Sequence, residues 1–317
     1  MAPEELERAI LGGTPDLTGE QISDLAGLSI EQAQRLWRAL GFPEAPGGPV
    51  FVEADAEALE RVARLRDAGE IDFETLLRMT RAVGQTMDRL AAWEVATLAA
   101  TLEKQRPGES LRSQALRLVD AVGEDFEALL TYAWRRHLAA AVARLQAMAA
   151  ARDEEVLEAT VGFADLVSFS ALSNDLRENE IGDLVEIFEA RSRDAISRRG
   201  GRVVKALGDS VLFLATSPAE GMEIAWDVIR LIGGDDRLPD VHVGVVTGPV
   251  VQRMGDVYGP AVNLASRLVG VARRNRVITD RHTAEQLPDD RFEVQVLPAR
   301  PIRGFGDLEP VSVRRAS

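Results

Sequence analysis

The chain has 317 residues, no cysteine and a net charge of −14, because 51 acidic residues outnumber 37 basic ones. The missing cysteines exclude disulfides, thiolate metal sites and cysteine nucleophiles, and the acidic charge opposes non-specific binding to nucleic acid or anionic membranes. The length is typical of two domains. The first residues lack the basic-then-apolar order of a signal peptide, and the most apolar stretch, 138–151, is too short to span a bilayer. We therefore expect a cytoplasmic protein without a membrane span.

The first 150 residues predict a helical domain. Apolar residues recur at intervals of three and four, as on one helix face, in five segments: 19–26, 30–40, 54–68, 73–102 and 111–151. Thr18, Ser29 and Asp72 precede three of these segments and are typical N-cap residues. Residues 128–158 are expected to form one helix that links this domain, residues 1–150, to a second domain over residues 159–317.

From about residue 156 the pattern changes to alternating strands and helices. Helices are expected near 176–199, 219–232 and 259–272, and strands at 161–167, 202–207, 210–216, 241–248, 249–254, 277–279 and 292–297. This order, βαββαββαββ, is typical of helices packed on one mixed sheet. The predicted fold class is therefore α+β, with an all-helical N-terminal half followed by an α/β sandwich.

Two aspartates occur where predicted strands meet turns. Asp165 lies within the apolar run 161–167, and Asp209 lies in a Gly-Asp turn that would join two strands as a hairpin. An acid among apolar strand residues is costly to bury without a cation. Two facing carboxylates can hold one or two Mg²⁺ or Mn²⁺ ions together with phosphate oxygens. Each residue alone also fits a plain structural role, as a strand-end cap or as part of a turn.

A further polar pair occurs within residues 255–268. Asn263 and Arg267 are four residues apart, so a helix would present both on one face. Asparagine supplies a hydrogen bond of fixed direction, and arginine supplies a planar fork suited to phosphate. For an isolated pair, a solvated polar helix face is the simpler explanation.

Three segments together resemble the class III nucleotidyl cyclases: FADLVSFS (163–170), KALGDSV (205–211) and DVYGPAVNLASR (256–267). The resemblance covers about residues 159–317 and implies a head-to-tail homodimer with two active sites at its interface. It implies that Asp165, Asp209 and the backbone carbonyl of Leu166 bind two Mg²⁺ or Mn²⁺ ions. It also implies that Asn263 orients the ribose and that Arg267 stabilises negative charge at the reacting phosphorus.

The same resemblance indicates which nucleotide is bound. Lys205 and Asp256 match the pair that reads the purine in this family. Their chemistry fits adenine, because lysine can donate to N1 and aspartate can accept from the N6 amine, whereas guanine presents the reverse pattern. Guanylyl members carry glutamate at the position of Lys205, so ATP is the expected substrate, with cyclic AMP and pyrophosphate as products. Arg303, in PIRGFGD, stands where the family often has a phosphate-binding lysine, and a solvated strand-end arginine is the alternative.

Residues 10–150 are similar to the regulatory domain of soluble, pH-responsive actinobacterial cyclases, through RLWRALGFPEAP (35–46) and FVEADAEALERV (51–62). This resemblance implies an autoinhibitory domain that can dimerise and bind a fatty acid, although its apolar runs also fit a core or a dimer interface. His137 lies on the expected linking helix. We hypothesise that it is a proton switch, because the ordinary histidine pKa of about 6.5 lies between pH 5 and 8. A plain helix-surface role is the alternative.

Three alternatives to a nucleotidyl cyclase of this family have some support in the sequence. Residues 17–42 have the pattern of a helix-turn-helix, but the second helix carries only Arg35 and Arg38 as basic residues. The first 150 residues hold 16 basic and 24 acidic residues, a charge of −8 that opposes DNA binding. GGDDR (233–237) resembles a diguanylate cyclase signature, but it follows a helix and is predicted to be a loop. A catalytically silent nucleotide-sensing or dimerisation module remains the main alternative.

Overall fold

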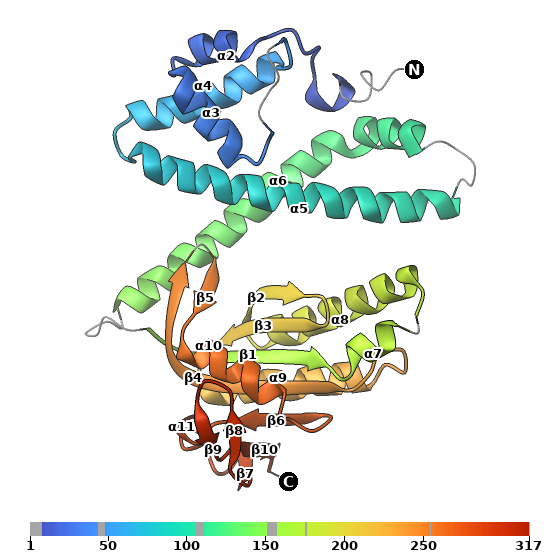
Figure 1. Cartoon of the computed structure of the whole chain (residues 1–317), viewed down its shortest axis with the longest axis vertical. Helices are drawn as coiled ribbons and strands as arrows, with labels where there is room; N and C mark the ends of the chain where they lie inside the picture. Colours follow the sequence, from blue (N-terminus) through green and yellow to red (C-terminus); the bar gives the residue numbers. More distant parts are fainter. Residues whose placement is uncertain are drawn as a thin grey trace. The chain divides into compact units, whose positions relative to one another are not determined.

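The computed structural model of the chain describes residues 8–43, 48–105, 111–150, 157–174, 176–253 and 255–316. The chain divides into two compact units, Met1–Ala150 and Ala151–Ser317 (Figure 1). Each unit has its own hydrophobic core, because the buried clusters of the two units share no residue.

The first unit is helical, as predicted. Thr18 accepts a hydrogen bond from the Gln21 backbone N–H, and Ser29 accepts one from that of Gln32, while each glutamine side chain bonds back to the cap backbone. Asp72 accepts a hydrogen bond from the Thr75 backbone N–H, in the first turn of the helix that begins at Phe73. The expected N-caps are therefore confirmed. The helices are α2 (Gly19–Ala26), α3 (Ile30–Ala39), α4 (Glu53–Asp67), α5 (Phe73–Gln105) and α6 (Leu111–Ala150).

The helix predicted over residues 128–158 does not extend to its expected end. α6 ends at Ala150, residues 151–156 lie outside the described residues, and Leu157 and Glu158 already belong to a strand. The strand begins there because alternate residues pair in register with a neighbouring strand, with Leu157 opposite Val250 and Val161 opposite Val246. Within the described ranges, no helix is both long and apolar enough to cross a membrane.

The second unit is built on a mixed sheet with the strand order β2-β3-β1-β4-β6-β10-β7, to which β5 adds beside β4. Among the described strands, β4 pairs with β6 in parallel, and the other pairs are antiparallel. The strands are β1 (Leu157–Leu166), β2 (Arg202–Leu207), β3 (Ser210–Ala215), β4 (Val241–Arg253), β5 (Asp256–Tyr258), β6 (Arg276–Thr279), β7 (Phe292–Val296), β8 (Arg300–Ile302), β9 (Gly306–Leu308) and β10 (Val311–Arg315). The helices are α7 (Phe169–Ser173), α8 (Glu178–Arg198), α9 (Pro218–Gly233), α10 (Pro260–Val269) and α11 (Arg281–Ala284).

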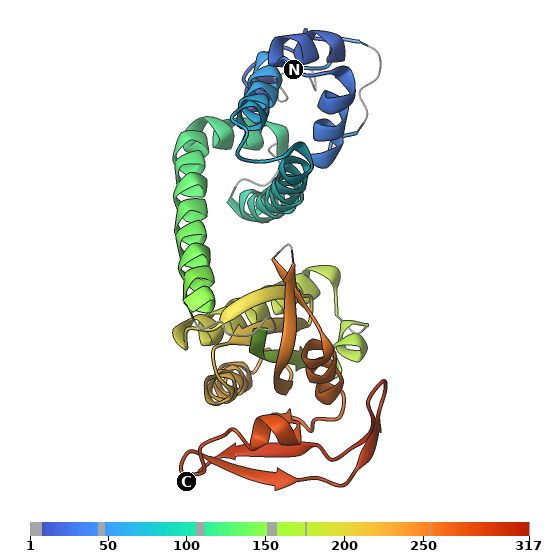
Figure 2. The same ribbon diagram turned by 90° about the vertical axis from the view of Figure 1, so that its left-hand side faces the viewer.

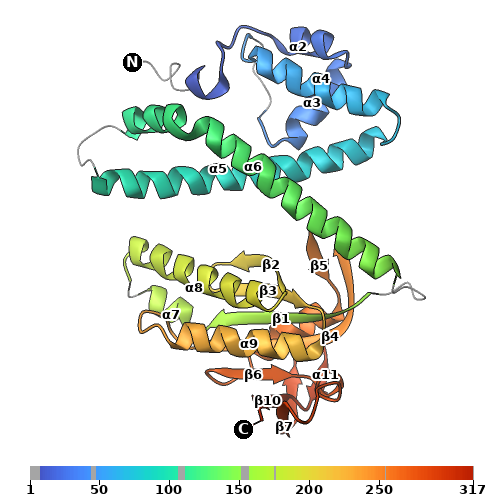
Figure 3. The same cartoon turned by 180° about the vertical axis from the view of Figure 1, so that it is seen from behind.

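Helices cover both faces of this sheet. α8 and α9 lie on one face (Figure 3), where they pack on inward residues such as Ala164 and Phe213. α10 packs on the opposite face, against the intervening residues such as Val161 and Leu212. Two buried faces arise because successive strand residues point to opposite sides. The predicted α+β fold class is confirmed.

Several strands differ from the prediction. The sequence predicts separate strands at 241–248 and 249–254, but β4 runs unbroken through Pro249 and continues toward β5 (Figure 2), with residue 254 outside the described residues. Proline is tolerated at position 249 because β6 pairs with β4 from His242 to Gly244 and not beyond. On the β6 side of β4, therefore, no backbone N–H is needed at residue 249. The sequence prediction did not include β5, β8, β9, β10, α7 or α11.

Candidate active site

Asp165 and Asp209 lie close together at the end of β1. Asp165 points to the sheet face that α10 covers, since Val161 on the same side of the strand packs into that core. Asp209 occupies the turn between β2 and β3, where the expected hairpin is present and Gly208 has a φ of 64°, a conformation that glycine adopts readily. The Leu166 backbone N–H donates to the Asp209 carbonyl oxygen at 2.9 Å. This bond ties the turn to the end of β1.

The electrostatic environment of Asp165 favours a nearby cation. Burial raises the pKa of its carboxyl group above the ordinary value, and the Asp209 carboxylate raises it further. A hydrogen bond from the Ser210 hydroxyl and the proximity of His242 lower it, but less strongly. The Asp165 carboxylate, whose charge is disfavoured by burial and by the neighbouring Asp209 carboxylate, would be stabilised by a bound cation.

The donor set fits a divalent cation that is bound together with a substrate. Asp165 and Asp209 supply carboxylate oxygens and Leu166 supplies a backbone carbonyl, the hard oxygen ligands that Mg²⁺ prefers. In the part of the chain that the structure describes, no group of three or more His, Cys, Asp or Glu side chains could hold a metal ion. The remaining ligands would therefore come from water or phosphate oxygens, as is usual for Mg²⁺.

Lys205 and Asp256 form a direct ion pair. Lys205 Nζ donates to Asp256 Oδ2 at 2.6 Å, although the two residues are 51 positions apart in the sequence. Burial raises the pKa of Asp256, but the hydrogen bond from Lys205 and another from the Val257 backbone N–H outweigh it and hold the pKa below its ordinary value. Asp256 is therefore an ionised acceptor beside an ammonium donor. The structure brings these two predicted residues together.

Asn263 and Arg267 lie on the exposed side of α10. The opposite side of the helix is buried on the sheet, through residues such as Ala265 and Leu268. α10 approaches β4 so closely that a Cβ at Gly244 would lie 2.5 Å from the Ala265 carbonyl oxygen, which is why glycine is needed there. Asn263 and Arg267 therefore share one face of the helix, as predicted. Both side chains are exposed, so the surface of another molecule can contact them.

The two remaining predicted residues lie apart from these groups in the chain. Arg303 is exposed in the turn between β8 and β9. His137 is exposed on α6 in the first unit. Neither position by itself indicates a chemical role.

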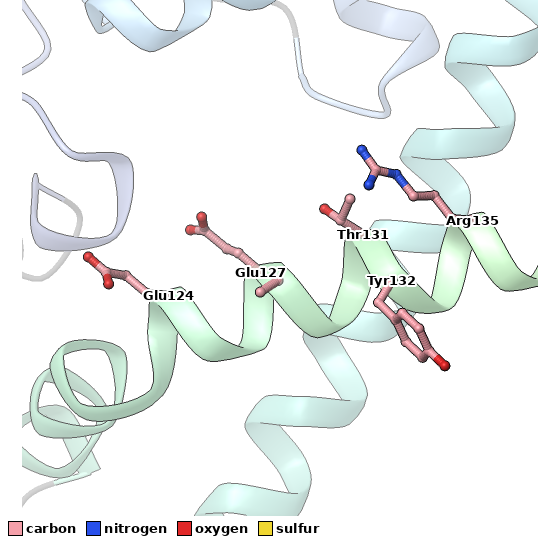
Figure 4. Close-up of a pocket in the computed structure, with 6 residues that line it drawn as sticks. Glu124, Glu127, Thr131, Tyr132 and Arg135 are labelled. Carbon is pink, nitrogen blue, oxygen red and sulfur yellow. The ribbon is translucent and has the colours of Figure 1, made fainter.

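An open hollow of about 490 Å³ lies along α6 (Figure 4). Its lining includes Glu124, Glu127 and Arg135 together with Thr131 and Tyr132. A fatty-acid chain needs an apolar lining, and two glutamates disfavour its carboxylate. This hollow therefore does not support the expected fatty-acid site.

The sequence prediction missed Ser210 and His242. Both flank Asp165 in the sheet register, Ser210 on β3 and His242 on β4. The Ser210 hydroxyl donates to Asp165, whereas burial lowers the pKa of His242 against the raising effect of Asp165. Ser210 lies within the motif at 205–211, but its proximity to Asp165, like that of His242, follows from strand pairing and requires the register to be known.

Both units match known families. Residues 151–313 match the adenylate and guanylate cyclase catalytic domain, and residues 6–131 match the adenylate cyclase regulatory domain. An adenylate cyclase of Streptomyces coelicolor is 37% identical over 96% of this chain and 87% of that protein. A pH-sensitive adenylate cyclase of Mycobacterium tuberculosis is 28% identical over 95% of this chain and 79% of that protein. The crystal structure of a rhodopsin-guanylyl cyclase catalytic core in complex with ATPαS has a TM-score of 0.47 at 21% identity, over 51% of this chain and 99% of that one.

Proposed function

Since this chain belongs to the adenylate and guanylate cyclase family, we propose that it is a homodimeric adenylate cyclase that converts ATP into 3′,5′-cyclic AMP and pyrophosphate. The contact of Lys205 Nζ with Asp256 Oδ2 at 2.6 Å carries this proposal. It places a hydrogen-bond donor beside an acceptor, the complement of the N1 acceptor and N6 donor of adenine. Guanine, with a donor at N1 and an acceptor at O6, would mispair with both side chains.

In the proposed reaction, the 3′-hydroxyl of ATP gives up its proton to water, its oxygen bonds to the α-phosphorus, and the bond from the α-phosphorus to the leaving pyrophosphate breaks. Asp165 and Asp209, with the Leu166 carbonyl, would hold two Mg²⁺ or Mn²⁺ ions. Such ions, when bound, acidify the 3′-hydroxyl and neutralise charge on the triphosphate. Arg303 provides a further phosphate contact. The assignment of a metal site to the two aspartates is supported by burial and by the neighbouring Asp209 carboxylate, which both raise the pKa of Asp165.

The second protomer of the proposed dimer supplies the other side of each site. Its Asn263 orients the ribose, and its Arg267 stabilises the negative charge that develops around the α-phosphorus. The exposure of both side chains on α10 supports this role, because neither is committed to the core of its own chain. Lys205 and Asp256 read adenine from the same protomer as Asn263 and Arg267.

The test is nucleotide cyclisation by the full chain with ATP and GTP in the presence of Mn²⁺. We expect cyclic AMP from ATP at a kcat/KM at least about a hundredfold above that for GTP, because a site built to hydrogen-bond one base edge rejects the other. Binding of ATP by a folded, dimeric protein without turnover would favour the silent nucleotide-sensing module instead. Preferential formation of cyclic GMP would contradict the roles of Lys205 and Asp256.

We further propose that the helical unit regulates catalysis, with His137 as a proton-sensitive residue. The match of residues 6–131 to a regulatory domain supports the first part, and the exposure of His137 on α6 supports the second, since an exposed ring can contact other surfaces. We expect His137→Asn to flatten the activity-versus-pH curve between pH 6 and 8, measured as cyclic AMP formation. An unchanged curve would remove His137 from the proposal. A fatty acid is not part of it.

A further inference from the structure

A row of polar side chains crosses four strands beside the two aspartates. Asp165 of β1 lies between Ser210 of β3 and His242 of β4. His242 in turn lies beside Arg276 of β6. Side chains in register point to the same face of a sheet. For this row it is the α10 face, because Ile278, two residues after Arg276, packs into the core under α10.

Arg276 lies just beyond the part of the sheet that α10 covers. The last turn of α10 is against Gly244, where an added Cβ would lie 3.1 Å from the Val269 backbone nitrogen. The next position on this face of β4 is His242, beside Arg276, and both are only partly buried. Adjacent strands are about 4.8 Å apart, so the Cα atom of Arg276 is roughly 10 Å from that of Asp165. The arginine side chain can cover much of that distance.

Arg276 supplies a permanent positive charge to this row, because a guanidinium group does not deprotonate in proteins. Its planar fork matches the oxygens of a phosphate group. The neighbouring Arg274 is less suited, since it is highly exposed and its guanidinium lies 3.8 Å from the Asp240 carboxylate. A triphosphate held through divalent cations at Asp165 and Asp209 would therefore have the positively charged side chain of Arg276 two strands from Asp165.

We infer that Arg276 is a further substrate-binding residue, which contacts the terminal phosphates of the triphosphate held at Asp165 and Asp209. This inference rests on the proposed function, because it takes ATP as the substrate. It gives the triphosphate a direction, from the two aspartates across β4 toward β6. Since the terminal phosphates leave as pyrophosphate, Arg276 contacts both ATP and pyrophosphate but makes no contact with AMP.

The test is Arg276→Gln in the full chain. We expect the KM for ATP to rise about tenfold with kcat little changed, because a contact made equally in the ground state and the transition state affects binding alone. The Kd for pyrophosphate, measured by calorimetry in the presence of Mn²⁺, should rise by a similar factor, and the Kd for AMP should stay the same. Arg276→Lys keeps the charge but lacks the fork, so its effect should be smaller.

Arg193→Gln is the matched control, since Arg193 is exposed on α8, on the opposite face of the sheet, and the charge change is identical. It should leave all these constants unchanged. Unaltered affinity of Arg276→Gln for pyrophosphate, or equal loss of affinity for pyrophosphate and AMP, would overturn the inference. If Arg276→Gln does not fold, the pyrophosphate affinity of Arg276→Lys decides in the same way. Absence of cyclic AMP formation by the wild type would contradict the proposed function, whereas the pyrophosphate measurement tests Arg276 by itself.

Discussion

Replacement of Asp209 by asparagine is expected to lower cyclic AMP formation by about a thousandfold, because metal-assisted stabilisation of the transition state is worth several kcal/mol. Asparagine is well tolerated in turns, and the Asp209 backbone carbonyl would still accept from the Leu166 N–H. The hairpin should therefore persist while one carboxylate is lost. The measurement is the initial rate of cyclic AMP formation at saturating ATP and Mn²⁺, together with the melting temperature.

A mixing experiment provides the control for this variant. Arg267→Ala should also be nearly inactive by itself, because it lacks the cation proposed to act at the α-phosphorus. Mixed with Asp209→Asn, it should recover about one quarter of wild-type activity, since half of the dimers would be mixed and each would hold one complete site. Persistent inactivity after demonstrated subunit exchange would contradict shared sites. Near-wild-type activity of Asp209→Asn would contradict the two-aspartate metal site.

The second large effect concerns the choice of base. In the double variant Lys205→Glu/Asp256→Asn, glutamate can accept from guanine N1 and the asparagine amide can donate to O6. We expect kcat/KM for ATP to fall by about 10³-fold, because a site built to hydrogen-bond one base edge rejects a base that leaves its groups unpaired. GTP should become the better substrate. The measurement is kcat/KM for both nucleotides.

Asn263→Ala serves as the comparison for the base-specificity variant, because its proposed contact is with the ribose, which ATP and GTP share. It should reduce both kcat/KM values by a similar factor and leave their ratio unchanged. A double variant that still prefers ATP to the wild-type extent would show that Lys205 and Asp256 do not read the base.

The helices were largely predictable from the sequence because their ends carry local signals. Thr18, Ser29 and Asp72 act as N-caps in the structure, as their positions before apolar-periodic segments predict. The start of β1 was not predictable in this way. The segment before Leu157 continues the helical pattern, and only the pairing of β1 with β4 shows where the strand begins.

The short strands of the second unit lack such local signals. β10 contains Val311 and Val313, which are fully buried, and it lies between β6 and β7. Its remaining residues include Arg314 and Arg315, so the sequence of this segment looks polar although the strand lies inside the sheet. Position within the sheet, rather than composition, determines burial in this case.

In the candidate site, too, local motifs predict some residues, whereas others are identified only by strand pairing. Asp165 and Asp209 are recognisable from their motifs, and the resemblance to class III cyclases is confirmed by the family match. The position of Arg276 beside His242 depends on register, and a slip of one residue would turn that side chain to the opposite face. Contacts that depend on long-range pairing therefore require the structure.

The bond between Lys205 and Asp256 has a consequence for how a nucleotide enters and leaves. Each group is the partner of the other, yet each has spare bonding capacity, because an ammonium group has three donors and a carboxylate can accept several hydrogen bonds. Adenine can therefore bind beside the intact ion pair, with Lys205 on N1 and Asp256 on N6. The pair holds both groups in place before a nucleotide arrives, so little side-chain freedom is lost on binding. When cyclic AMP departs, the same pair is ready for the next ATP.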